Sequence, residues 1–303
     1  MAGQLLPALR ERYELRLVDI RATDAEGRTV EGVEIADLAT PDRTEVAPLF
    51  EGIDVVVHLG YRHSAPGNNY DATVPHIEKF EDEFANIRMA QNVYRCSFDG
   101  GIRRVVVASS NHAADWTENA LVHTGKRDVQ TTGELPLADN FYGWSKACYE
   151  NLGFLYSCGS LGRQLEVVQV RIGSPRDLDV RVYSVDEPPA PQPGPAYPTG
   201  LARYKRDLGA WLSVRDAQQL FLRSLETEDI TNWYGVPWLV VYGISDNTRA
   251  FWSLASAREV LGYQPQDDSE IRYAADIHAL LTGPDAPGGP GRVGDAGREK
   301  LWD

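Results

Sequence analysis

Residues 105–112 read VVVASSNH, and this stretch decides the fold. Its valines and alanine form the apolar run of a strand buried on both faces, as strands of a parallel sheet are. Four polar residues, Ser109, Ser110, Asn111 and His112, stand at the carboxyl end of the run. Ligands of open α/β sheets bind beyond the carboxyl ends of the strands, so we expect a functional site here. Turn and cap formation is the alternative role for such residue types.

Outward from this strand, similar apolar runs alternate with amphipathic stretches, which predicts an α/β fold. We expect strands at residues 15–19, 55–59, 105–109, 167–172 and 239–243. We expect helices at residues 81–98, 142–157, 214–225 and 251–261, the last one closed by Gly262. The regular alternation predicts a Rossmann-type, doubly wound parallel sheet.

The composition excludes some classes of function. A formal net charge of −14 over 303 residues opposes binding to a nucleic-acid backbone. The three cysteines, Cys96, Cys148 and Cys158, show no CxxC spacing, so we expect free thiols and predict neither disulfides nor a metal site. No apolar stretch has the length of a membrane helix, and the first residues soon become charged, unlike a signal peptide. We therefore expect a soluble, cytoplasmic protein without a membrane partner.

Tyr142 and Lys146 form the strongest catalytic candidate. They lie four residues apart in YGWSK, and on a helix this spacing puts both side chains on one face. Alone, the pattern also fits a surface tyrosine above a surface lysine. Its position in the stretch after VVVASSNH favours an active site at the sheet edge.

Together these motifs resemble the extended short-chain dehydrogenases/reductases, the NAD-dependent epimerase/dehydratase family, and within them the uronate dehydrogenases and archaeal NAD-dependent glucose-6-phosphate dehydrogenases. The resemblance covers nearly the whole chain. It is carried by RLVD, VVVHLG, FANIRMAQNV, VVVASSNH, FYGWSK, VRIGS, AWLSVRD, VVYGISDNTR and VLGYQPQDD. It implies an NAD-dependent oxidoreductase, uronate dehydrogenase-like, that oxidises a hexuronate or sugar phosphate at its anomeric carbon to the lactone. A homodimer is also implied.

The resemblance implies catalytic roles for four residues. Tyr142 would be the general base, Lys146 would bind the nicotinamide ribose, and Ser110 would hold the reacting oxygen. An ammonium one helical turn from a phenol favours the phenolate, which agrees with these roles. Asn86 would hold a water or the backbone near the lysine, with a solvated helix residue as the alternative.

On the cofactor side, Asp19 ends a strand where an acid accepts hydrogen bonds from the adenine ribose and repels a 2′-phosphate, which favours NAD over NADP. Arg21 weakens that preference, and a turn residue is the alternative role of Asp19. Tyr61 is bulkier than the small residue usual in the family. The implied cofactor-binding residues are Asp19, Ile20, Asp37, Leu38, Leu59, Gly60, Tyr61, Asn86, Tyr142, Lys146 and Ile172.

On the substrate side, the resemblance implies contacts from Ser110, Asn111, His112, Arg171 and Arg206. A guanidinium can bind a carboxylate or phosphate bidentately, so we expect an anionic sugar read by Arg171. The alternative is that Arg171 pairs with a neighbouring acid. Arg206 lies in the run ARYKRD, for which a solvated face is the ordinary outcome.

Two features depart from the family pattern. The family's first strand and glycine-rich turn are missing before Met1, so we expect the true protein to begin further upstream; the alternative is a naturally shortened chain with poor cofactor binding. Residues 174–200 are too rich in proline for a helix or interior strand. We expect an NAD-binding domain at residues 1–174, a substrate-side loop and lobe at 175–282, and a disordered tail at 283–303.

Three functions remain open. Besides the dehydrogenase, the same tyrosine and lysine would serve a nucleotide-sugar epimerase or dehydratase, which keeps the hydride within one cycle. A non-catalytic dinucleotide-binding relative is the third, and the retained Ser110, Tyr142 and Lys146 argue against it.

Overall fold

The computed structural model describes residues 1–62, 79–183 and 197–282, in which parallel strands alternate with helices as the sequence predicts. The strands are β1 (Leu17–Asp19), β2 (Val33–Ile35), β3 (Val55–His58), β4 (Arg104–Ser110), β5 (Glu166–Ile172) and β6 (Trp238–Gly243). β3, β4, β5 and β6 form one sheet in that order, and β1 pairs with β2 in a second sheet. Every pairing is parallel. The α/β class and the parallel sheet are thereby confirmed.

The helices lie between the strands along the chain. They are α1 (Ala2–Arg10), α2 (Phe80–Asp99), α3 (Asp115–Thr117), α4 (Phe141–Ser157), α5 (Gly200–Ala210), α6 (Val214–Glu226), α7 (Ala255–Leu261), α8 (Ser269–Arg272) and α9 (Ala274–Thr282). Four predicted helices correspond to α2, α4, α6 and α7, although α7 begins four residues later than predicted. Gly262 ends α7 at a φ of 64°, a left-handed conformation that glycine adopts without strain.

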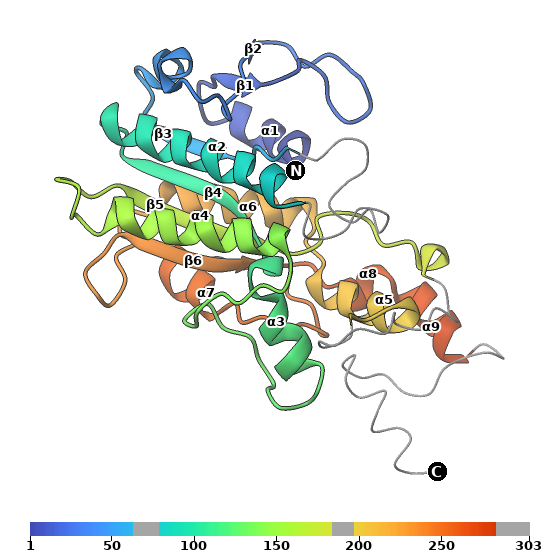
Figure 1. Ribbon diagram of the computed structural model, residues 1–303. Helices are drawn as coiled ribbons and strands as arrows, with labels where there is room; N and C mark the ends of the chain where they lie inside the picture. The colour runs from blue at the N-terminus through green and yellow to red at the C-terminus, as the bar shows by residue number, and fades with distance from the viewer. Residues whose placement is uncertain (63–78, 184–196, 283–303) are drawn as a thin grey trace.

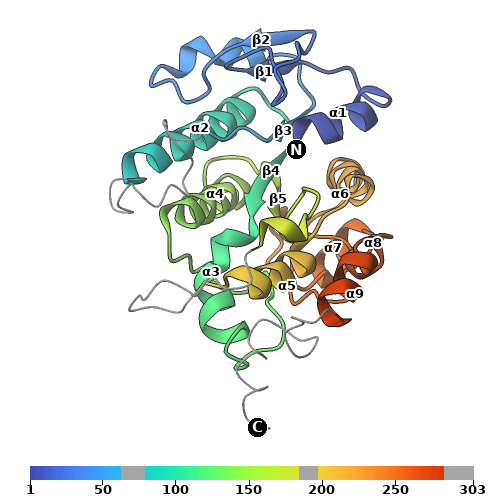
Figure 2. The same cartoon turned by 90° about the vertical axis from the view of Figure 1, so that its right-hand side faces the viewer.

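Side-chain alternation along β4 divides the main core into two halves. Val105 and Val107 pack with α2 and α4, whereas Val106 packs with α1 and α6. These pairs of helices cover opposite faces of the sheet (Figures 1 and 2). All three valines are fully buried, which explains why the sequence reads as an unbroken apolar run.

A third, smaller core lies beyond the carboxyl ends of the strands, where α5, α8 and α9 gather (Figure 1). It contains Leu178, Tyr204, Leu208, Trp211, Tyr273 and Ile277. This group of helices covers the edge of the sheet where polar side chains end β4, and so it bounds the site from one side.

The connecting segments agree with the sequence where they are described. Residues 175–183 and 197–199 contain one 3-10 turn, Val180–Val182, and no other helix or strand. The predicted tail at 283–303 and most of the proline-rich loop lie outside the described residues. All three cysteines are free, as predicted. Among the described helices, none has both the length and the apolar character needed to cross a membrane.

Candidate active site

The carboxyl end of β4 turns directly into the candidate site. Ser110 caps the 3-10 turn Asn111–Ala114, and its hydroxyl accepts a hydrogen bond from the backbone N–H of His112 at 3.2 Å. Ser110 and Asn111 are buried, whereas His112 is partly exposed. The polar residues therefore do form a turn and cap, as one prediction held, and the turn places them at the end of the sheet where ligands bind.

Helix α4 begins against this turn. The side chain of Asn140 accepts a hydrogen bond from the backbone N–H of Gly143 at 2.8 Å and so caps the helix. A side chain at position 143 would not fit, because its Cβ would lie 2.1 Å from the carbonyl oxygen of His112. Glycine at this position lets the helix carry Tyr142 up to the end of β4.

Tyr142 and Lys146 lie on the face of α4 that meets the sheet. The centroid of the Tyr142 ring is 5.6 Å from the centroid of the His112 ring and 5.7 Å from Lys146 Nζ. Lys146 is buried, and its ammonium donates a hydrogen bond to the carbonyl oxygen of Ala108 at 3.1 Å. Burial lowers the pKa of Lys146 to about 8, and the nearby Glu83 opposes this shift. The surface alternative for the pair does not hold for the lysine.

Helix α2 supports the lysine from its other side. Asn86 is fully buried and clamps the backbone of Arg62, accepting from its N–H at 2.8 Å and donating to its carbonyl at 3.0 Å. It is therefore not the solvated residue of the alternative prediction. Glu83 is also buried and accepts hydrogen bonds from Ser145 at 2.7 Å and from the Tyr61 hydroxyl. Burial raises the pKa of Glu83, against the influence of these hydrogen bonds and of Lys146.

Tyr61 packs directly on Tyr142 and Lys146. Its ring lies 5.2 Å from the Tyr142 ring, edge to face, and 4.9 Å from Lys146 Nζ. Burial, followed by the charge of Glu83, raises the pKa of Tyr61, so the phenol stays protonated. The bulky side chain thus takes part in the aromatic surroundings of Lys146.

The predicted cofactor-binding residues lie at or beyond the carboxyl ends of the strands. Asp19 ends β1 as an exposed carboxylate and accepts from the backbone N–H of Arg21 at 3.1 Å, the turn contact of the alternative prediction. Ile20 beside it is exposed, and Asp37 forms an ion pair with Arg62 at 3.3 Å. Leu38 follows β2, Leu59 and Gly60 follow β3, and Ile172 is the last residue of β5.

Some of these positions fit a dinucleotide. An exposed carboxylate at a strand end can accept hydrogen bonds from a ribose. An ammonium has three donors, of which the Ala108 carbonyl takes one at Lys146. A Cβ at Gly60 would lie 2.9 Å from Met89 Sδ, so a larger residue would have to displace the methionine side chain. The residues present therefore suit a ribose and its nicotinamide end.

Arg171 does not extend toward a ligand. Its side chain is 1% exposed, and its Nε and Nη2 donate to the two oxygens of Glu150 at 2.8 and 2.7 Å. Its Nη1 donates to the Tyr242 hydroxyl at 3.1 Å. This geometry corresponds to the alternative in which Arg171 pairs with a neighbouring acid, and the pair ties α4 to β5.

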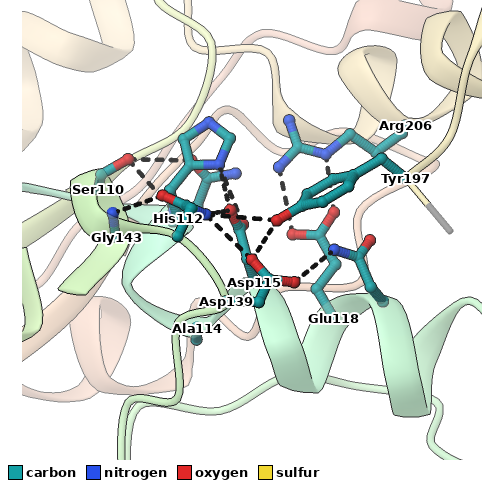
Figure 3. Close-up of polar contacts among 12 residues, drawn as sticks. Ser110, His112, Ala114, Asp115, Glu118, Asp139, Gly143, Tyr197 and Arg206 are labelled. Carbon is teal, nitrogen blue, oxygen red and sulfur yellow. Dashed lines mark hydrogen bonds and ion pairs between the residues drawn. The ribbon is translucent and has the colours of Figure 1, made fainter. Parts of the chain in front are cut away.

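Arg206 is also held by carboxylates, and Figure 3 shows its contact with Glu118. Its Nε and Nη2 donate to the two oxygens of Glu118 at 2.8 and 3.2 Å, and its Nη1 donates to Asp207 at 3.1 Å. The side chain is 11% exposed, so Arg206 is not on the solvated face of the alternative prediction. Nearby, Asp115 lies 2.8 Å from Nδ1 of His112.

The structure thus brings together Ser110, His112, Tyr142, Lys146 and Asn86. Arg171 lies on the neighbouring strand opposite Ser109, but its guanidinium is engaged by Glu150 and Tyr242. Sequence reasoning missed the carboxylates Glu83, Asp115, Glu118 and Glu150. A local signal existed for two of them, because Glu83 and Asp115 stand three residues from Asn86 and His112, on the same helical face. Glu118 and Glu150 pair with arginines distant in the chain, which no local pattern indicates.

Comparison with known proteins shows the family of this chain. The model of the NAD dependent epimerase/dehydratase family matches residues 3–160. The NAD-dependent glucose-6-phosphate dehydrogenase of Haloferax volcanii is 30% identical over 274 residues, which is 88% of each chain. The L-arabinose 1-dehydrogenase (NAD(P)(+)) of the same organism is 31% identical over 86% of this chain and 92% of its own. A mutant uronate dehydrogenase from Agrobacterium tumefaciens, complexed with NAD, has a TM-score of 0.64 at 26% identity, covering 96% of this chain and 88% of its own.

Proposed function

Because the chain belongs to the NAD dependent epimerase/dehydratase family, we propose that it oxidises a sugar at the anomeric carbon to a lactone. Its cofactor is NAD. Its relatives are NAD-dependent sugar dehydrogenases, named for uronate, glucose 6-phosphate and L-arabinose. The observation that carries the proposal is the position of the buried Lys146 ammonium, 5.7 Å from the centroid of the partly exposed Tyr142 ring. The next residue, Gly143, packs closely against the turn Asn111–Ala114 that follows Ser110.

In the proposed reaction, Tyr142 Oη takes the proton from the sugar hydroxyl as a general base. The Lys146 ammonium stabilises the negative charge that proton transfer leaves near the phenol. Ser110 Oγ lies at the end of β4 and holds the reacting oxygen by a hydrogen bond. The chemistry that NAD would supply, when bound, is an acceptor for the hydride of the carbinol carbon.

Two side chains would hold NAD directly. Lys146 would donate to the nicotinamide ribose, and the Asp19 carboxylate would accept from the adenine ribose. Asn86 would act indirectly, because it fixes the backbone at Arg62 beside Tyr61.

A screen of sugars with NAD⁺, followed at the NADH absorbance, tests the proposal. The expected result is stoichiometric NADH and lactone with at least one aldose, uronate or sugar phosphate. An epimerase or dehydratase would convert a nucleotide sugar without net NADH, and this outcome would replace the proposal. No turnover of any sugar, together with tight NAD⁺ binding, would favour a non-catalytic role.

A further inference from the structure

The carboxylate of Glu118 accepts hydrogen bonds from the guanidinium of Arg206, which could otherwise bind an acidic sugar. Arg206 donates from Nε and Nη2 to Glu118 (Figure 3). Its Nη1 donates to Asp207, so all three of its nitrogens already donate to carboxylates. Burial alone would raise the pKa of Glu118, but Arg206 and His123 lower it to about 2. The pair is therefore ionised throughout the pH range in which an enzyme works.

Further carboxylates lie along the side of the site between His112 and Arg206, which is called the wall below. Asp115 is buried beside His112, and Asp139 accepts hydrogen bonds from Tyr197 and from Asn140, the latter at 3.0 Å. Asp207, on the other side of Arg206, also lies 3.7 and 3.9 Å from the exposed Arg176 and Arg203. Within residues 79–183 and 197–282, the wall between His112 and Arg206 thus holds three carboxylates, Asp115, Glu118 and Asp139, against one guanidinium.

Two buried amides on this wall have atoms without a partner among the described residues. Asn111 and Asn119 are 1% and 3% exposed, and Nδ2 of Asn111 and Oδ1 of Asn119 make no hydrogen bond there. Asn111 adjoins Ser110, and Asn119 donates to Asp139 at 3.4 Å. Buried polar atoms are rarely left unsatisfied, so this unused donor and this unused acceptor are available to a polar ligand.

We propose that the substrate of this site is an uncharged sugar and that Glu118 excludes acidic ones; this rests on the proposed function. Sugar hydroxyls can donate to Asp115 and Asp139 and can pair with both amides. A substrate carboxylate or phosphate needs an unoccupied guanidinium fork, and Glu118 already fills that of Arg206. The acidic group of such a substrate would also lie near the carboxylates of the wall, and like charges disfavour its ionised form. This proposal differs from the anionic substrate predicted from the sequence.

Wild-type selectivity is the first test. D-Galactose and D-galacturonate differ only at C6, and kcat/KM should be at least about tenfold higher for the neutral sugar. D-Glucose against glucose 6-phosphate repeats the test with a phosphate. A preference for galacturonate or glucose 6-phosphate would overturn the inference while leaving the dehydrogenase function intact. If no sugar is oxidised, the proposed function fails, and calorimetry with the galactose pair decides the charge preference: tighter binding of galacturonate, or binding of neither, overturns it.

The substitution Glu118→Gln tests the assigned residue. It keeps the shape of the side chain and removes the charge, so Arg206 becomes available and the kcat/KM ratio of galacturonate to galactose should rise about tenfold. Asp99→Asn is the matched control, because Asp99 pairs with Arg95 on α2 far from the carboxyl ends of the strands. A folded Glu118→Gln enzyme with the wild-type ratio would contradict the role of Glu118. If this variant does not fold, the wild-type comparison still decides the substrate class.

Discussion

At the scale of single residues, the hydroxyl of Tyr142 is the atom on which the proposed chemistry depends. Tyr142→Phe should lower kcat at least about 100-fold, because a positioned general base contributes on that scale. The ring contacts with His112 and Tyr61 remain, so the melting temperature and NAD⁺ affinity should change little. Tyr234→Phe is a matched control, since Tyr234 is 60% exposed. Wild-type turnover by Tyr142→Phe would show that another group takes the proton.

His58 makes the free energy of unfolding depend on pH. It is 4% exposed, its Nε2 has no partner among the described residues, and burial together with Lys146 lowers its pKa to about 3. The unfolded chain takes up this proton near the ordinary value of 6.5, so the folded form binds fewer protons between pH 6.5 and about 3. The contribution is therefore complete above pH 6.5 and is lost progressively as the pH falls through that window.

The substitution His58→Gln should flatten this loss. The measurement is the free energy of unfolding by urea for both proteins, once near neutrality and once near pH ~4.5, halfway down the window. The difference between the two pH values is the readout, because it cancels the packing cost of the substitution. Equal pH dependence in wild type and variant would mean that His58 is not buried in its neutral form.

Residue identity alone could not place the charges of the site. The spacing of Tyr142 and Lys146 is local, so the sequence could indicate it, whereas the role of Arg206 depends on Glu118, which is 88 residues away in the chain. Arg171 likewise depends on Glu150, 21 residues away. A guanidinium that reads a substrate and one that is already neutralised have the same local sequence.

At the scale of elements, the seating of α4 on the turn after β4 fixes the distance between the proposed base and Ser110. Gly143→Ala puts a Cβ 2.1 Å from the His112 carbonyl oxygen, so either the helix or the turn must move. We expect a stability loss of about 1–3 kcal/mol, as for overpacked cores, with a larger fall in kcat than in NAD⁺ affinity. Gly133→Ala is the matched control, since its Cβ meets nothing within 4 Å. Unchanged activity in Gly143→Ala would show that this contact does not position Tyr142.

The predictable elements are those whose sequence repeats a simple pattern. The five predicted strands and four predicted helices appear because each has either an apolar run or an amphipathic face. β2 has three residues, and α8 has four, too few to establish a period. α5 was missed because its polar residues Arg206 and Asp207 are engaged in ion pairs, so its sequence reads as a solvated run.

At the scale of the whole molecule, the net charge of −14 should make stability depend on salt. Exposed ion pairs such as Arg12–Glu226 are weakened by salt, but each contributes little. Repulsion among the excess carboxylates acts over longer distances, and the screening length falls from about 30 Å at 0.01 M to about 8 Å at 0.15 M salt. The repulsion therefore outweighs the pairs, and the free energy of unfolding at pH 7 should rise between these two concentrations of KCl. Near the sequence pI of about 4.9 the net repulsion vanishes, and the same increase in KCl concentration should leave the free energy of unfolding unchanged or lower it slightly.

Urea titrations at both pH values measure this effect of salt. A salt-induced loss of stability at pH 7 would mean that the ion pairs outweigh the repulsion due to the net charge.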